Sequence, residues 1–92
     1  KGGVVNFTRA VAAELATSGI TCNAICPGYF ETELTKPVLD TEEFQAYMKA
    51  TVPMQRYGQE GELNAGAIFL ASKEASYVTG VILPIDGGYT AV

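Results

Sequence analysis

The sequence has 92 residues, 48% of them hydrophobic, which predicts one small globular domain. A net charge of -4 argues against nucleic acid or an anionic membrane surface as partner, and no apolar run reaches the roughly 20 residues of a membrane-spanning helix. The absence of histidine excludes a Ser-His-Asp site and most zinc sites, so proton transfer would need Lys, Tyr, a carboxylate or a cofactor.

The first element expected is a helix over residues 2–17, because Val4, Phe7, Val11 and Leu15 fall at helical spacing. Gly19 provides its C-cap. The periodicity starts without a capping residue, so we expect the chain to be the carboxyl-terminal part of a longer protein. Lys1, at the start of this helix, would ordinarily be a solvated charge.

Residues 20–26 are predicted to form a strand that stops at Pro27-Gly28. Proline cannot donate to a sheet, and glycine lets another molecule approach the backbone closely. Ligands of open α/β sheets bind beyond the carboxyl ends of the strands, so residues 27–32 form a candidate ligand loop, although Pro-Gly alone is also typical of an ordinary turn. Asn23 is expected to anchor that loop, and Thr32 could simply cap a following helix.

The same strand would contain both cysteines, Cys22 and Cys26. At about 3.3 Å per residue they would lie too far apart for a disulfide. We interpret them as small buried side chains in a reducing, cytoplasmic compartment, in preference to a metal pair or a reactive thiol.

Two further helices and a strand follow. An amphipathic helix is predicted after the acidic start at residues 40–43, with Phe44, Tyr47, Met48 and Val52 on one face. A helix over residues 60–72 is apolar on nearly every side, which predicts burial against the sheet on one side and a second subunit on the other.

Residues 81–85 form an unbroken apolar strand, typical of a parallel sheet covered on both faces, and Pro84 indicates an edge strand. Asp86-Gly87-Gly88 is expected to turn the chain. The tail after this turn, residues 89–92, could reach a neighbouring subunit.

Five motifs occur in a fixed order: Asn23-x-Ile25-x-Pro27-Gly28-x-x-x-Thr32, Pro53-x-x-Arg56-x-Gly58, Phe69-Leu70-Ala71-Ser72, Tyr77-Val78-Thr79-Gly80 and Asp86-Gly87-Gly88. As a set they resemble the short-chain dehydrogenase/reductase family. The resemblance covers residues 1–92 and implies an α/β fold: the carboxyl-terminal portion of a Rossmann-type, doubly wound parallel sheet. The implied order is helix, strand, lid, helix and strand, within a single NAD(P)-binding domain.

Within this family, the segment from Gly28 to Lys36 most resembles the gluconate 5-dehydrogenase group, with 3-oxoacyl carrier-protein reductases next. The sequence departs from the family pattern at Glu60 and Gly61, which replace the proline and the first glutamate of the usual Gly-x-Pro-Glu-Glu. The family pattern therefore does not determine at which residue the helix predicted at residues 60–72 begins.

The resemblance implies an NAD(P)-dependent oxidoreductase that transfers hydride between nicotinamide and a secondary alcohol or ketone, such as gluconate and 5-ketogluconate. Lys1 would be the lysine of a Tyr-x-x-x-Lys motif, lowering the pKa of a tyrosine outside this sequence and binding the nicotinamide ribose. The implied contacts to NAD or NADP come from the loop residues Pro27, Gly28, Phe30 and Thr32. Tyr29 would face the small-molecule substrate, the amphipathic helix would be a substrate lid, and no metal is implied.

The implied protein is a dimer or tetramer held together through residues 60–72 and the last strand. The alternative is a non-catalytic oligomerisation module, because the Gly-rich phosphate loop and the catalytic Ser and Tyr are missing from this sequence. The 92 residues alone are therefore expected to be inactive. A 3-oxoacyl carrier-protein reductase is a further alternative.

Overall fold

The computed structural model describes residues 2–92, and Lys1 lies outside the described residues. Contacts divide the chain into two units. The first contains the described residues up to Cys26 together with Asn64–Leu83, and the second contains Pro27–Leu63 and Pro84–Val92. No helix of the described residues combines the length and the apolar character that crossing a membrane requires.

The two strands pair in parallel, as the sequence predicts. β1 (Ala24–Pro27) and β2 (Ile82–Ile85) form a two-stranded sheet. Ala24 N donates to Val81 O at 2.9 Å and Gly28 N donates to Ile85 O at 3.0 Å, so both bonds have the same offset along the chain. The predicted strand bounds are wrong for β1: the strand starts at Ala24 rather than at residue 20, and it includes Pro27 as its last residue, a position that needs no donor.

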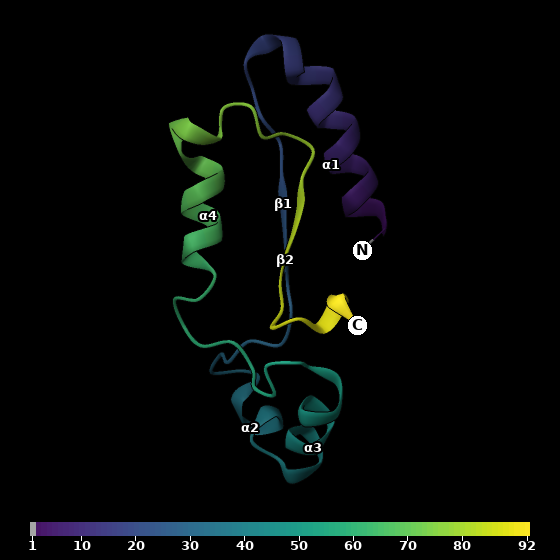
Figure 1. The fold of residues 1–92 in the computed structure, drawn as a ribbon, viewed down its shortest axis with the longest axis vertical. Helices are drawn as coiled ribbons and strands as arrows, with labels where there is room; N and C mark the ends of the chain where they lie inside the picture. Colours follow the sequence, from purple (N-terminus) through teal and green to yellow (C-terminus); the bar gives the residue numbers. More distant parts are fainter. Residues whose placement is uncertain (1) are drawn as a thin grey trace. The chain divides into compact units, whose positions relative to one another are not determined.

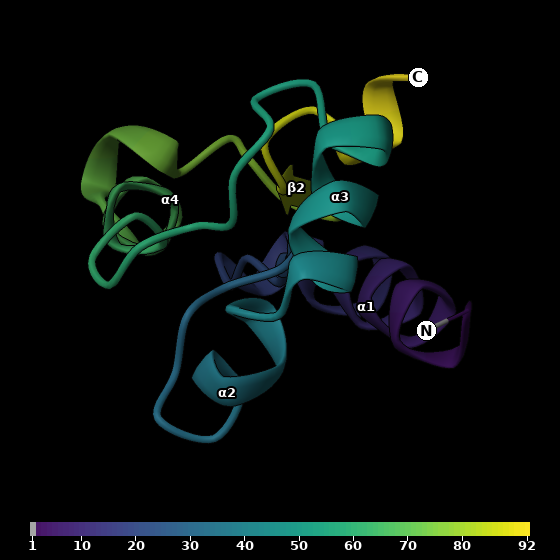
Figure 2. The same ribbon diagram turned by 90° about the horizontal axis from the view of Figure 1, so that it is seen from below.

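Helix α1 (Gly2–Leu15) of the first unit is extended by a 3-10 turn, Ala16–Ser18. Gly19 then adopts φ 76° and donates its N–H to Ala16 O, which confirms the predicted C-cap. Helix α4 (Asn64–Ala71) lies on the opposite side of the strands from α1 in both ribbon views (Figure 1 and Figure 2).

The predicted start of α4 at residue 60 is wrong. Residues 60–63 form a turn in which Gly61 has φ 92°, a conformation that breaks the helix. The predicted burial of α4 is not found within this chain either: none of its residues is buried, and Ile68 is 68% exposed.

Asn23 is an anchor, as predicted, but not of the loop that follows β1. Its Nδ2 donates to Val78 O at 3.1 Å, and its Oδ1 accepts from Val81 N at 2.9 Å. The side chain therefore holds the connector that enters β2, all within the first unit. Cys22 and Cys26 are free and half-buried rather than fully buried.

The second unit contains the amphipathic helix that the sequence predicts, α3 (Glu42–Thr51). The Thr41 hydroxyl accepts from Phe44 N at 3.3 Å, as an N-cap does. Met48, Val52 and Leu39 are buried and form the core of this unit. Short helix α2 (Lys36–Leu39) begins at Lys36, so the helix expected directly after Thr32 starts after an intervening turn.

The end of the chain also belongs to the second unit. Gly87 and Gly88 have φ 65° and 96°, which confirms the predicted turn. A 3-10 turn, η3 (Tyr89–Ala91), follows it. The Tyr89 ring packs edge-on to Tyr29 at 5.9 Å, so the start of the tail contacts its own unit. The expected contact of the tail with a neighbouring subunit stays a prediction.

Candidate functional site

The loop after β1 begins at Gly28, where the chain leaves no room for a side chain. A Cβ on Gly28 would lie 2.7 Å from Asp86 Cβ and 2.8 Å from Asp86 Cα. The close approach of Asp86 therefore requires a glycine at this position, and the predicted approach of a ligand to the loop stays a prediction.

Phe30 ties the loop to the segment after α3. Glu31 N donates to Gly58 O at 2.9 Å, and Gly58 N donates to Tyr29 O at 2.7 Å, forming a parallel bridge. The Phe30 ring covers Gly58 so closely that a Cβ there would collide with it. Within the described residues, the backbone amide of Phe30 makes no hydrogen bond and is available as a donor.

Thr32 and Thr35 form a reciprocal pair. Thr35 N donates to Thr32 Oγ1 at 3.1 Å, Thr32 N donates to Thr35 Oγ1 at 3.0 Å, and the two hydroxyls lie 2.9 Å apart. Thr32 therefore does act as a cap for the turn that leads into α2. Thr32 is also exposed, so its hydroxyl stays within reach of a ligand.

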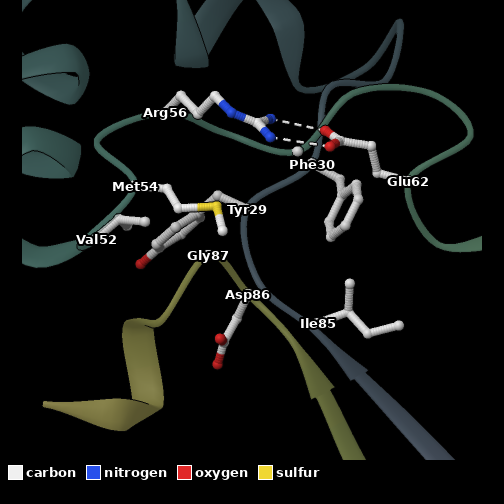
Figure 3. A pocket seen from close by; sticks show the side chains of 10 residues that line it. Tyr29, Phe30, Val52, Met54, Arg56, Glu62, Ile85, Asp86 and Gly87 are labelled. Atoms are coloured by element: carbon white, nitrogen blue, oxygen red, sulfur yellow. Dashed lines mark hydrogen bonds and ion pairs between the residues drawn. The ribbon is translucent and has the colours of Figure 1, made fainter. Parts of the chain in front are cut away.

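A cavity of about 160 Å³ lies beside this loop in the second unit, with a largely apolar lining that Arg56, Glu62 and Asp86 interrupt (Figure 3). Its lining consists of Tyr29, Phe30, Val52, Met54, Arg56, Gly58, Glu62, Ile85, Asp86 and Gly87. Arg56 Nη1 and Nη2 bind Glu62 Oε1 and Oε2 at 2.7 Å and 2.9 Å, a bidentate pair that lowers the pKa of Glu62 to about 2.

Asp86 organises the end of the chain. Its carboxylate accepts from Gly88 N at 3.0 Å, from Thr90 N at 3.2 Å and from the Thr90 hydroxyl at 2.8 Å. The Thr90 hydroxyl is the largest cause of the lowered pKa of Asp86. These bonds fix η3 and with it the position of Tyr89.

Three aromatic rings gather around Tyr29 of the loop: Phe44 and Tyr47 come from α3, and Tyr89 comes from η3. The rings of Phe44, Tyr47 and Tyr89 all meet Tyr29 edge-on, at 5.1, 6.1 and 5.9 Å. The Tyr29 hydroxyl donates to Tyr47 Oη at 3.5 Å, which raises the pKa of Tyr29 to about 12 and lowers that of Tyr47.

A second polar cluster holds α2 against the loop. Lys36 Nζ lies 3.1 Å from Glu31 Oε1 and 3.2 Å from Asp40 Oδ2, and the bond to Glu31 is the largest cause of the raised pKa of Lys36. Tyr57 Oη donates to Asp40 at 3.1 Å and to Glu31 at 3.3 Å. The i, i+4 spacing of Lys36 and Asp40 is a sequence signal for part of this cluster, whereas Tyr57 has none.

The structure thus brings together Pro27, Gly28, Tyr29, Phe30 and Thr32 in one unit, while Lys1 lies outside the described residues. Sequence reasoning assigned no site role to several residues at the cavity and the aromatic cluster, among them Glu62, Asp86 and Tyr89. No group of three or more His, Cys, Asp or Glu side chains that could hold a metal occurs in the part of the chain that the structure describes.

Residues 1–90 match a family model described as enoyl-(acyl carrier protein) reductase. The chain belongs to the short-chain dehydrogenase/reductase family. The resemblance stated from the motifs is thereby confirmed. Galactitol 2-dehydrogenase (L-tagatose-forming) of Cereibacter sphaeroides is 50% identical over 91 residues, a match that covers 98% of this chain and 35% of that protein.

Solved structures of family members confirm the fold class. A putative gluconate dehydrogenase from Agrobacterium tumefaciens superposes with a TM-score of 0.93 at 44% identity, covering 99% of this chain and 36% of that one. A gluconate 5-dehydrogenase from Burkholderia cenocepacia, in complex with NADP and tartrate, gives 0.92 at 41% identity, covering 100% and 36%. The short-chain dehydrogenase/reductase chain therefore spans about a third of the length of these relatives.

Proposed function

We propose that the chain contributes the carboxyl-terminal segment of a single NAD(P)-binding domain, in an oxidoreductase that interconverts a secondary alcohol and a ketone, with a polyol or a sugar acid as substrate. The observation that carries the proposal is the loop after β1. It combines an obligatory glycine, a free Phe30 amide and an exposed Thr32 hydroxyl at the carboxyl end of a parallel strand.

The loop fits a dinucleotide through its donors. The Phe30 amide and the Thr32 hydroxyl would bind the nicotinamide carboxamide and the pyrophosphate, while Pro27 and Gly28 set the path of the backbone. Lys1 would donate to the ribose hydroxyls and lower the pKa of the tyrosine that acts as acid and base. When bound, NAD or NADP supplies the hydride acceptor or donor. Tyr29 would face the substrate.

The relatives support this substrate class. A galactitol dehydrogenase acts on a polyol, and two structural relatives are described as gluconate dehydrogenases, one of them solved with NADP. The free cysteines Cys22 and Cys26 suit a reducing compartment, which makes the cytoplasm the proposed location.

We further propose that the complete protein is a homo-oligomer that buries α4 and the last strand β2. Ile68 and Phe69 on α4 are 68% and 48% exposed. The helix is thus an apolar element without cover in this chain, and a second subunit is the occupant that the proposal assigns to it.

The test compares Thr32→Val with Thr35→Val in the complete protein that carries this sequence. Both variants break the hydroxyl pair, but only Thr32→Val removes the proposed cofactor contact. We expect Thr32→Val to weaken cofactor use by about 1 to 2 kcal/mol, seen as a raised KM for NAD or NADP. Thr35→Val should leave most of that affinity in place.

Equal losses in the two variants would instead assign Thr32 a purely structural role. Failure of the complete protein to oxidise any polyol or sugar acid with either cofactor would favour the non-catalytic module. Reduction of a 3-oxoacyl thioester in preference to a keto sugar acid would favour the carrier-protein reductase.

A further inference from the structure

We propose that the hydroxyls of Tyr47 and Tyr89 form a recognition site for substrate hydroxyl groups, which makes Tyr89 a specificity-determining residue. This inference rests on the proposed function, because it assigns part of that substrate site to α3 and to the turn after Asp86. The pair lies wholly within the second unit.

Three phenol oxygens from three separate segments of the chain converge at this site. Tyr29 Oη lies 3.5 Å from Tyr47 Oη, which lies 3.4 Å from Tyr89 Oη. Bonds between hydroxyl oxygens are usually about 2.7 to 2.8 Å long, so these contacts are long and weak. Each phenol can donate one bond and accept others, which leaves capacity for a ligand.

The hydroxyls of Tyr47 and Tyr89 are accessible, while their rings are held in place. Tyr47 and Tyr89 are 42% and 38% exposed, so a small molecule can reach both hydroxyls. Their rings are nevertheless held by edge-on contacts to Tyr29, and η3 is fixed by the Asp86 carboxylate. A site with little remaining side-chain freedom loses less entropy when a ligand binds.

The chemistry of the aromatic cluster indicates the class of ligand that it can bind. The cluster presents neutral hydroxyls and aromatic edges, and none of its side chains is cationic. A ligand with hydroxyl groups on adjacent carbons suits such a surface. Each of its hydroxyls can replace one long hydrogen bond between two phenols with two shorter hydrogen bonds, one to each phenol. A secondary alcohol with no further hydroxyls would gain nothing from it.

The experiment uses Tyr89→Phe in the complete protein, which removes the hydroxyl and keeps the ring. The substrates are galactitol and cyclohexanol, secondary alcohols with and without additional hydroxyl groups. We expect the KM for galactitol to rise about three- to tenfold, the range for one lost neutral hydrogen bond, while the values for cyclohexanol and the cofactor stay constant. Tyr77→Phe is the matched control, because Tyr77 is fully exposed and lies in the first unit.

An unchanged KM for galactitol would overturn the inference, and so would an equal loss for both alcohols, which would indicate a structural role. If neither alcohol is oxidised, the proposed function is tested separately with other polyols and with sugar acids, and calorimetric titration with galactitol decides the inference by itself. Binding that weakens in Tyr89→Phe but not in Tyr77→Phe would sustain it. Absence of galactitol binding to the unmodified protein, with and without cofactor, would overturn it.

Discussion

Gly28 illustrates at the scale of one residue how a contact within the chain can require a glycine in addition to the cause expected from the sequence. The sequence predicts a glycine that lets a ligand approach, and the structure adds a second reason for it, because a Cβ on Gly28 would lie against Asp86. The sequence points to this position because Pro-Gly follows an apolar strand directly, although the same pair is typical of an ordinary turn. The contact with Asp86 could not be predicted, since it depends on a residue 58 positions further along the chain (86 − 28).

We predict that Gly28→Ala destabilises the complete protein by about 1 to 3 kcal/mol, because the new methyl group meets the backbone of Asp86 and neither segment can yield cheaply. Thermal unfolding measures the effect. Gly3→Ala is the matched control, since a Cβ there meets nothing within 4 Å and alanine favours the helix. A melting temperature for Gly28→Ala at or above that of the unmodified protein would contradict the close approach.

The sequence predicts whether a segment is a helix or a strand better than it predicts the residues at which the helix or strand begins. Helix α3 carries a clear apolar face and an acidic start, and both its existence and its N-cap region follow from them. The start of α4 cannot be predicted in the same way. Gly61 and the side chain of Glu62 form a turn at residues where the apolar pattern alone would predict helix. β1 starts late because the Asn23 side chain takes bonds that a longer strand would make through its backbone.

The ion pair between Arg56 and Glu62 predicts that the stability of the protein depends on pH through the turn before α4. Ion pairing lowers the pKa of Glu62 from 4.5 to about 2, so the pair's contribution to stability is complete above pH 4.5 and is lost as the pH falls toward 2. Glu62→Gln should therefore be less stable than the unmodified protein at neutral pH, and the gap should narrow below about pH 4.5.

Urea unfolding of the complete protein at several pH values measures this gap. Glu60→Gln serves as its control, because Glu60 is exposed and outside the ion pair. If the difference in unfolding free energy between Glu62→Gln and the unmodified protein stays constant down to pH 3, the ion pair does not stabilise the protein as proposed.

For the whole molecule, the notable property is the amount of apolar surface that the chain leaves open. Its exposed large hydrophobic residues occur in both units and include Val4, Phe7, Leu34, Ile68 and Phe69. A chain of this size buries only a small core, so such surface is costly unless something covers it. The sequence indicated this for α4, whose apolar residues leave no polar face, but it could not identify the cover.

We predict that Ile68→Glu lowers the oligomeric mass of the complete protein, because a carboxylate buried at the proposed subunit interface has no partner. Sedimentation velocity at micromolar concentration measures the mass. Leu34→Glu is the control, as Leu34 is 89% exposed and lies in the other unit. An oligomer that survives Ile68→Glu unchanged, or an unmodified protein that is already a monomer, would rule out α4 as the interface.

The two hydrogen bonds that hold the Asn23 side-chain amide also affect the chemical stability of the protein during storage. Spontaneous deamidation requires the backbone nitrogen of Ala24 to attack the Asn23 side-chain carbon. Here the amide is held by Val78 O and Val81 N, while Ala24 N is engaged with Val81 O at 2.9 Å. The attack releases ammonia and leaves a cyclic imide that hydrolyses to aspartate or isoaspartate. Folded molecules are shielded from this reaction and unfolded ones are not, so aspartate and isoaspartate that accumulate at this position during storage would be a chemical record of time spent unfolded.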